Sequence, residues 1–94
     1  MRLMLKFTIP VAKGNEAAKK GTIGSAINAL LDQVKAEAAY FTLEDGKRAG
    51  IVIFEETDQA KLTTYNEPMF AALDAAIEIK PVLTIDDLQK GLPG

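Results

Sequence analysis

The first segment of the chain alternates between apolar and polar side chains. Over residues 2–10 the apolar side chains fall on one face: Leu3, Leu5, Phe7 and Ile9. The other face holds Arg2, Met4, Lys6 and Thr8. A period of two is typical of a β-strand with one buried face, and Pro10 can end such a strand because it has no N–H to donate. We therefore expect the first strand over residues 2–10.

From Thr22 onward the apolar period becomes helical. One stripe contains Ile23, Ile27, Leu30, Leu31 and Val34. Apolar positions that recur every three or four residues predict a helix, here with Thr22 as its N-cap and its end near residues 36–37. The preceding residues 11–21 include Gly14, Asn15 and Gly21. We expect a loop there with at most one helical turn, over residues 15–20.

The centre of the chain predicts a β-hairpin. Asp45-Gly46 separates an apolar segment at 38–43 from another at 48–55, and such a pair favours a type I′ turn. That turn places Phe41 opposite Gly50 and Tyr40 opposite Ile51, whereas a four-residue loop would change the register. Residues 51–54 are apolar on both faces. Helices on one side of a sheet would leave one of these faces uncovered, so we expect another cover for it.

The second half continues with a helix, a strand and a short helix. Thr57 is the expected cap of a helix from about Asp58, with Pro68 interrupting it near residues 66–67. Residues 75–83 alternate as a fourth strand, and Thr84 is expected to cap a helix over about 84–90, followed by a loose tail at 91–94. The resulting β-α-β-β-α-β order predicts one α+β domain over 1–94, of ferredoxin-like topology. Its four-stranded antiparallel sheet, in strand order 4-1-3-2, should carry the helices on one face.

Composition restricts the chemistry more than any motif does. The 94 residues include no cysteine, histidine or tryptophan. Ser-His and Cys-His nucleophile pairs and the usual nitrogen and sulfur zinc ligands are therefore excluded, and we expect no metal and no cofactor. The formal net charge is −2, so we expect no nucleic-acid partner. The apolar segments are too short for a membrane helix and the N-terminal one contains Lys6 and Thr8, so we expect a cytoplasmic protein without membrane association.

Three segments resemble the dimeric α/β-barrel superfamily and, within it, small bacterial proteins. The segments are EAAYFTLEDGKRAGIVIF, ETD and EPMFAALDAAIEIKPVLTIDDL, which span most of residues 37–88. The resemblance implies a homodimer in which two ferredoxin-like subunits pack sheet against sheet. The superfamily also contains cofactor-free monooxygenases, muconolactone isomerase-like enzymes and haem-degrading enzymes. The haem-degrading members usually use a histidine ligand, which this chain lacks.

Two groups of polar residues are candidate sites. Lys6, Tyr40, Thr42 and Glu78 should share the sheet face away from the helices, where Lys6 could bind an anion and Tyr40 could donate a proton. The alternative is a polar dimer interface in which Lys6 pairs with Glu78. Tyr65, Asn66 and Glu67 lie at the Pro68 break, where Tyr65 and Tyr40 could serve a pocket between helix and sheet. The alternative is a core tyrosine with its hydroxyl satisfied and an asparagine cap.

The sequence leaves two functions open. One is a homodimeric small-molecule-binding protein or a cofactor-independent enzyme acting on a small organic molecule. The other is a non-catalytic interaction module whose main role is dimerisation.

The acidic residues Glu55, Glu56 and Asp58 lack the spacing of a calcium loop, and we interpret them as the start of a helix.

Overall fold

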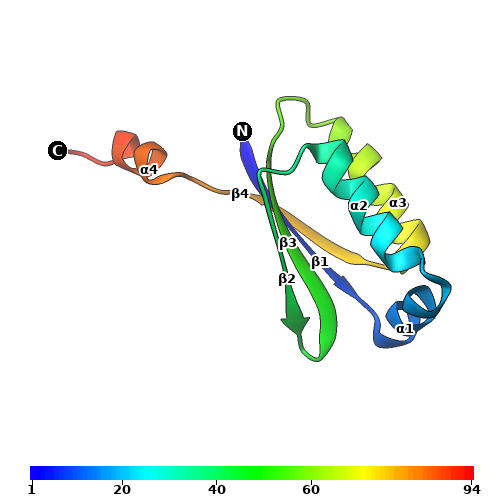
Figure 1. Cartoon of the computed structure of the whole chain (residues 1–94). Coiled ribbons are helices and arrows are strands. Elements are labelled where there is room, and N and C mark those ends of the chain that lie inside the picture. Colours follow the sequence, from blue (N-terminus) through cyan, green and yellow to red (C-terminus); the bar gives the residue numbers. More distant parts are fainter.

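The computed structural model describes residues 1–94 and has four strands and four helices. A sheet carries α1, α2 and α3 on one face, while α4 lies apart at the end of an extension of β4 (Figure 1). The elements in chain order are β1 (Arg2–Ile9), α1 (Val11–Lys20), α2 (Thr22–Val34), β2 (Ala38–Glu44), β3 (Lys47–Glu55), α3 (Lys61–Leu73), β4 (Ala76–Pro81) and α4 (Ile85–Gly91).

The four strands form one sheet in the order β2-β3-β1-β4. Every neighbouring pair is antiparallel. This is the predicted 4-1-3-2 order read from the other edge, and the α+β ferredoxin-like prediction is confirmed. The order leaves β2 and β4 as the two edge strands, and β3 and β1 lie in the centre.

The β2–β3 hairpin has the predicted turn and register. Asp45 and Gly46 have φ values of 49° and 76°, as a type I′ turn requires. Tyr40 pairs with Ile51 and Phe41 pairs with Gly50. The odd-numbered residues of β2 therefore face the helices, and the even-numbered residues face away from them.

The hydrophobic core lies between the sheet and helices α2 and α3. Thirteen buried residues form it. They come from the central strands β1 and β3, from the helices α1, α2 and α3, and from Ala75, which precedes β4. Leu5, Val52, Phe54 and Leu73 are completely buried. Phe54 also meets the ring of Tyr65 edge to face, with centroids 5.8 Å apart, a favoured aromatic geometry. The alternating apolar positions of β1 and the helical stripe of α2 thus meet in one layer.

The predicted loop over 11–21 is wrong, because this segment is a full helix. Gly14 lies buried inside α1, where a Cβ would approach Arg48 and Ile9. The glycine therefore permits close packing and does not break the helix. Thr22 is also not an N-cap: Gly21, with φ 71°, separates the two helices, and the Thr22 hydroxyl donates to the Ala17 carbonyl at 3.3 Å.

The predicted start and break of the second long helix are also wrong. The helix α3 begins at Lys61 rather than near residue 58, and Thr57 donates its N–H to the Glu56 carboxylate instead of capping the helix. Pro68 lies inside α3 without ending it. A proline inside a helix costs roughly 3 kcal/mol. Burial of Tyr65, Met69 and Leu73 on either side of it offsets that cost.

The C-terminal segment forms an arm that projects from the body (Figure 1). Thr84 caps α4 through a reciprocal capping box with Asp87, as the sequence predicts for Thr84. No residue of α4 is buried. The arm accounts for the elongated shape of the chain, which measures 54 × 28 × 17 Å along its principal axes. None of the four helices has the length and apolar character needed to cross a membrane.

Candidate functional site

The face of the sheet away from the helices, here called the open face, carries four of the predicted site residues. They lie in two neighbouring rows across the strands. The register aligns Tyr40, Ile51, Lys6 and Glu78 across all four strands. Thr42 lies in the adjacent row, opposite Ala49. The period of two that placed these residues on one face therefore predicted their grouping correctly.

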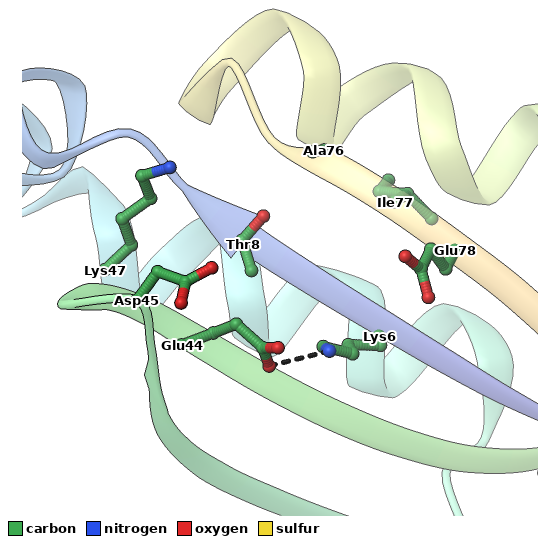
Figure 2. A pocket seen from close by; sticks show the side chains of 8 residues that line it. All are labelled: Lys6, Thr8, Glu44, Asp45, Lys47, Ala76, Ile77 and Glu78. Atoms are coloured by element: carbon green, nitrogen blue, oxygen red, sulfur yellow. Dashed lines mark ion pairs between the residues drawn. The ribbon is translucent and has the colours of Figure 1, made fainter.

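A polar hollow of about 240 Å³ lies on this face beside the hairpin turn. Figure 2 shows the side chains around it, which come from β1, β4 and the end of the hairpin. The lining residues are Lys6, Thr8, Glu44, Asp45, Lys47, Ala76, Ile77 and Glu78. Two predicted residues, Lys6 and Glu78, thus line the hollow, while Tyr40 and Thr42 lie beside it on the edge strand.

The ammonium of Lys6 pairs with Glu44 and not with Glu78. The Nζ atom lies 2.6 Å from a carboxylate oxygen of Glu44, which reaches it diagonally from β2 (Figure 2). Glu78 stands directly opposite Lys6 in the register, yet it forms no ion pair within 4 Å. The predicted alternative of a Lys6–Glu78 pair is therefore wrong within one chain. The hydrogen bond to Glu44 raises the pKa of Lys6, so its side chain stays charged.

Glu44, Asp45 and Lys47 are the lining residues that the sequence analysis missed. The sequence prediction used Asp45 only as a turn residue. The alternation of side chains along β2 could have identified Glu44, because Tyr40, Thr42 and Glu44 point to the same face of the strand. A residue that flanks a turn and is also the last residue of a strand can therefore both support the turn and line a site on that face of the sheet.

Tyr65 is satisfied by a carboxylate partner. It is buried in α3, and its hydroxyl donates a short hydrogen bond to Glu56. This bond raises the pKa of Tyr65 to about 12 and holds the pKa of Glu56 below its usual value. The Glu56 carboxylate also accepts the backbone N–H groups of Thr57 and Asp58, at 3.1 and 3.0 Å. Tyr65 therefore fixes the loop between β3 and α3, and the sequence analysis gave Glu56 no such role.

The structure does not bring Tyr40 and Tyr65 into one pocket. Tyr40 points from the open face, whereas Tyr65 packs on the helix side of the sheet. The predicted shared pocket between helix and sheet is therefore wrong, because the sheet separates the two rings. Asn66 is half-buried, and its Oδ1 atom has no hydrogen-bond partner. A hollow of about 270 Å³ next to Tyr65 is lined by Glu56 and Lys61 but not by Asn66.

The carboxylates of the chain do not cluster as a metal site requires. No group of three Asp or Glu side chains is arranged to hold a metal ion. Glu44, Asp45 and Glu78 line one hollow but are spread around its rim (Figure 2). The hollow thus has separate charged and hydrogen-bonding groups around its rim.

Comparison with known proteins supports the fold but gives no family. Neither a protein-family model nor a curated protein matches the sequence. Among solved structures, the de novo designed protein Ferredog-Diesel superposes with a TM-score of 0.50 and 7% sequence identity, over 86% of this chain and 85% of that chain. The periplasmic divalent cation tolerance protein CutA from Archaeoglobus fulgidus gives a TM-score of 0.47 and 18% identity, over 89% and 86%. At such identities the likeness concerns the fold alone.

Proposed function

We propose that this chain is a homodimeric small-molecule-binding protein whose ligand lies on the open face of the sheet. The observation that carries the proposal is the polar hollow of Lys6, Glu44 and Glu78 beside a partly exposed apolar surface on the same face. A second copy laid over this face would cover the apolar surface and close the hollow. The ligand would then bind between two sheets.

The apolar part of the open face supports self-association. Met4 and Ile53 pair across β1 and β3, and Ile51 lies one row further on. All three remain partly exposed, although Val52 and Phe54 on the other face of β3 are completely buried. A strand that is apolar on both faces is normally covered on both. A 94-residue chain also buries only about two thirds of its unfolded surface by itself, so a second layer would add stability.

The charges around the hollow support binding rather than proton transfer. The raised pKa of Lys6 keeps its amine protonated, and a general base needs an unprotonated group near neutral pH. Tyr65 gives its hydroxyl to Glu56 on the opposite side of the sheet, and Tyr40, the proposed proton donor, does not line the hollow. Fixed charges in a hollow are suited to orienting a ligand.

The same charges favour a ligand with a protonated amine. Three carboxylates and two ammonium groups line the hollow. Glu44 is occupied by Lys6, whereas Glu78 has no cation within 4 Å. A small primary amine would supply that cation, and the Thr8 hydroxyl offers it a further hydrogen bond. The expected anion at Lys6 would first have to displace Glu44.

Chemical-shift changes measured by NMR test this function. Isotope-labelled protein is titrated with ethanolamine and propylamine, and with propionate as the matched anion. We expect the amines to shift the amides of β1 and β4 around Thr8 and Glu78. Glu78→Gln should weaken amine binding at least about tenfold, because it removes a charge-assisted contact. Glu67→Gln, an exposed change on α3, is the control. The proposal would be refuted if the amines shifted no amide near the hollow, or if Glu78→Gln and Glu67→Gln bound the amines with equal affinity.

A second function, a module for self-association without a ligand, is favoured by one observation. The most exposed large apolar side chains do not line the hollow but lie on β2 and on the C-terminal arm. Tyr40, Leu43 and Leu83 are each more than 60% exposed. A dimer whose hollow responds to no probe in the NMR titration would support this function over ligand binding.

A further inference from the structure

The C-terminal arm carries an apolar stripe that its own chain leaves uncovered. Leu83, Ile85, Leu88 and Leu92 are 67%, 64%, 45% and 57% exposed. Ile85 and Leu88 are three residues apart and share one side of α4, and Leu92 follows the last residue of the helix. A seven-residue helix is marginal in water on its own. The capping box and the apolar stripe together indicate a helix that packs against another surface.

The arm leaves the body at the end away from the hairpin turn. Val82 donates its N–H to the Arg2 carbonyl at 3.1 Å, which fixes where the arm departs. At the other end of β4, Ala76 pairs with Thr8 near the hairpin turn. The six residues of β4 separate these ends by about 20 Å. Only Leu83 and Thr84 lie between Val82 and α4, so α4 cannot fold back to the hairpin end of its own chain.

The hairpin end of the body has a groove with the complementary character. It lies between α1 and the hairpin, and it is lined by Asn15, Glu16, Ala18, Lys19 and Arg48. Its one carboxylate, Glu16, is already paired with Lys13 and Lys20. Leu43 pairs with Arg48 across the strands and faces the same side, and it is 70% exposed. Phe41, two residues earlier on that face, is 55% exposed. The groove thus has two cationic groups, and the exposed apolar side chains of β2 lie beside it.

The charges of the groove and of α4 have opposite signs. Asp86 and Asp87 lie in the first turn of α4. Neither has a cationic group within 4 Å, and neither Lys19 nor Arg48 has a carboxylate within 4 Å. Arg48 donates only to the side-chain amide oxygen of Asn15, at 3.1 Å. A helix with acidic and exposed apolar side chains and a groove with two unpaired cationic groups beside exposed apolar side chains therefore occur at opposite ends of one chain.

We infer that α4 of one copy packs into the groove between α1 and the hairpin of a second copy, with Leu88 against Leu43 and Asp86 facing Arg48. The inference rests on the self-association in the proposed function, and it adds a defined segment and acceptor to it. In a two-fold dimer each copy both gives and receives an arm, so the contact occurs twice. The arm also covers Phe41 and Leu43 on β2, an edge strand that is otherwise open to further pairing.

Cysteine cross-linking between two different chains tests the contact directly. The chain has no cysteine of its own, so Leu88→Cys and Leu43→Cys can be made separately, mixed and oxidised. We expect a disulfide-linked heterodimer in at least about tenfold excess over a mixture of Leu88→Cys and Thr63→Cys. Thr63 is exposed on α3, outside the groove. Equal cross-linking in the two mixtures would overturn the inference.

The dimer dissociation constant, measured by sedimentation equilibrium, separates this contact from the open-face interface. Leu88→Ala should raise it about 100-fold, because each of two contacts loses one leucine worth roughly a factor of ten. Asp86→Arg and Arg48→Asp should each weaken the dimer, and the double variant should recover most of the loss. Circular dichroism checks that each variant is folded.

The outcomes distinguish the two interfaces. A dissociation constant unchanged by Leu88→Ala but raised by Ile51→Asp on the open face would overturn the arm contact and support the face-to-face dimer. The reverse result would support the arm contact and refute the face-to-face dimer. A native chain that stays monomeric at about 100 μM, far above the Kd of a specific complex, would overturn both.

Discussion

Replacing Gly50 with alanine should destabilise the protein because one methyl group has no space. A Cβ at this position would lie 2.5 Å from Cε2 and Cζ of Phe7 and 3.0 Å from Cδ1 of Phe41. The ring of Phe41 is 55% exposed and can move aside, but Phe7 is 1% exposed and held in the core. Gly50 does not have a positive φ, so the backbone itself accepts alanine. The cost therefore comes from overpacking.

The magnitude follows from two opposing effects. Forcing a methyl group into a packed core costs roughly 1–3 kcal/mol. Alanine also reduces the freedom of the unfolded chain, which returns about 0.4–1 kcal/mol. The balance is a loss between about 0 and 2.6 kcal/mol, centred near about 1.3 kcal/mol, which corresponds to roughly 5–10 °C in Tm for a domain of this size. Urea unfolding followed by far-UV circular dichroism measures it, at one protein concentration so that self-association contributes equally.

Gly24→Ala is the matched control for this prediction. Gly24 lies in α2, is exposed, and has nothing within 4 Å of a new Cβ. Alanine there should stabilise the chain by about 0.5–1 kcal/mol, because glycine is a poor residue inside a helix. The same substitution thus has opposite signs at the two positions. If Gly50→Ala is as stable as the unchanged chain, the contact between Phe7 and Gly50 is not as tight as described.

Three further predictions follow from single contacts. One of the two tyrosines should titrate at about pH 12 in absorbance at 295 nm, and Tyr65→Phe should remove that step. Because this pKa lies above the unfolded value, the stability that Tyr65 contributes is present below about pH 10 and lost as the pH rises through 12; a single tyrosine step near pH 10 would contradict it. Thr84→Ala removes the capping box and should speed amide exchange in residues 85–91 severalfold. At a protein concentration below the dimer dissociation constant it should leave Tm unchanged, since α4 buries no residue of its own chain; a lower Tm of the monomer would indicate that the arm supports the body. Gly46→Ala places alanine at φ 76° and should cost about 1 kcal/mol in urea unfolding, and an unchanged midpoint would contradict the type I′ turn.

The strands and their register were predictable because their signals are local. The period of two in residues 2–10 defines one buried face, and the Asp45-Gly46 pair sets the turn. From these, the pairing of Tyr40 with Ile51 follows by counting. The apolar content of residues 51–54 also predicted that the second face of β3 needs a cover other than the helices. None of these inferences needed knowledge of distant residues.

The helix boundaries were harder because tertiary contacts decide them. Gly14 resembles a loop residue in sequence, yet it lies where α1 approaches Arg48. Pro68 resembles a helix break, yet α3 continues because the residues around it are buried. Propensity and capping signals are outweighed at both places by packing that the local sequence does not contain.

The candidate site was predictable as a face but not as a set of contacts. The alternation of side chains and the expected strand order placed Lys6 and Glu78 side by side on one face, and they pair across β1 and β4 in the structure. It could not indicate that Lys6 would reach across β3 to Glu44, because a long side chain selects its partner by geometry in three dimensions. The same limit applies to Glu56 and Tyr65, nine residues apart and joined by the fold of one loop.

The location of the uncovered apolar surface links the proposed function to the arm. Residues 51–54 predict a face that the chain cannot cover by itself, and the structure leaves that face open beside the hollow. The arm presents a second uncovered surface, and its departure point beside Arg2 prevents it from covering the hairpin end of its own chain. Two complementary surfaces that cannot meet within one chain can meet between two. Asp86 is exposed and Arg48 is half-exposed, so salt screens the attraction between them. The arm contact should therefore weaken as ionic strength rises, while an apolar contact between the open faces should not.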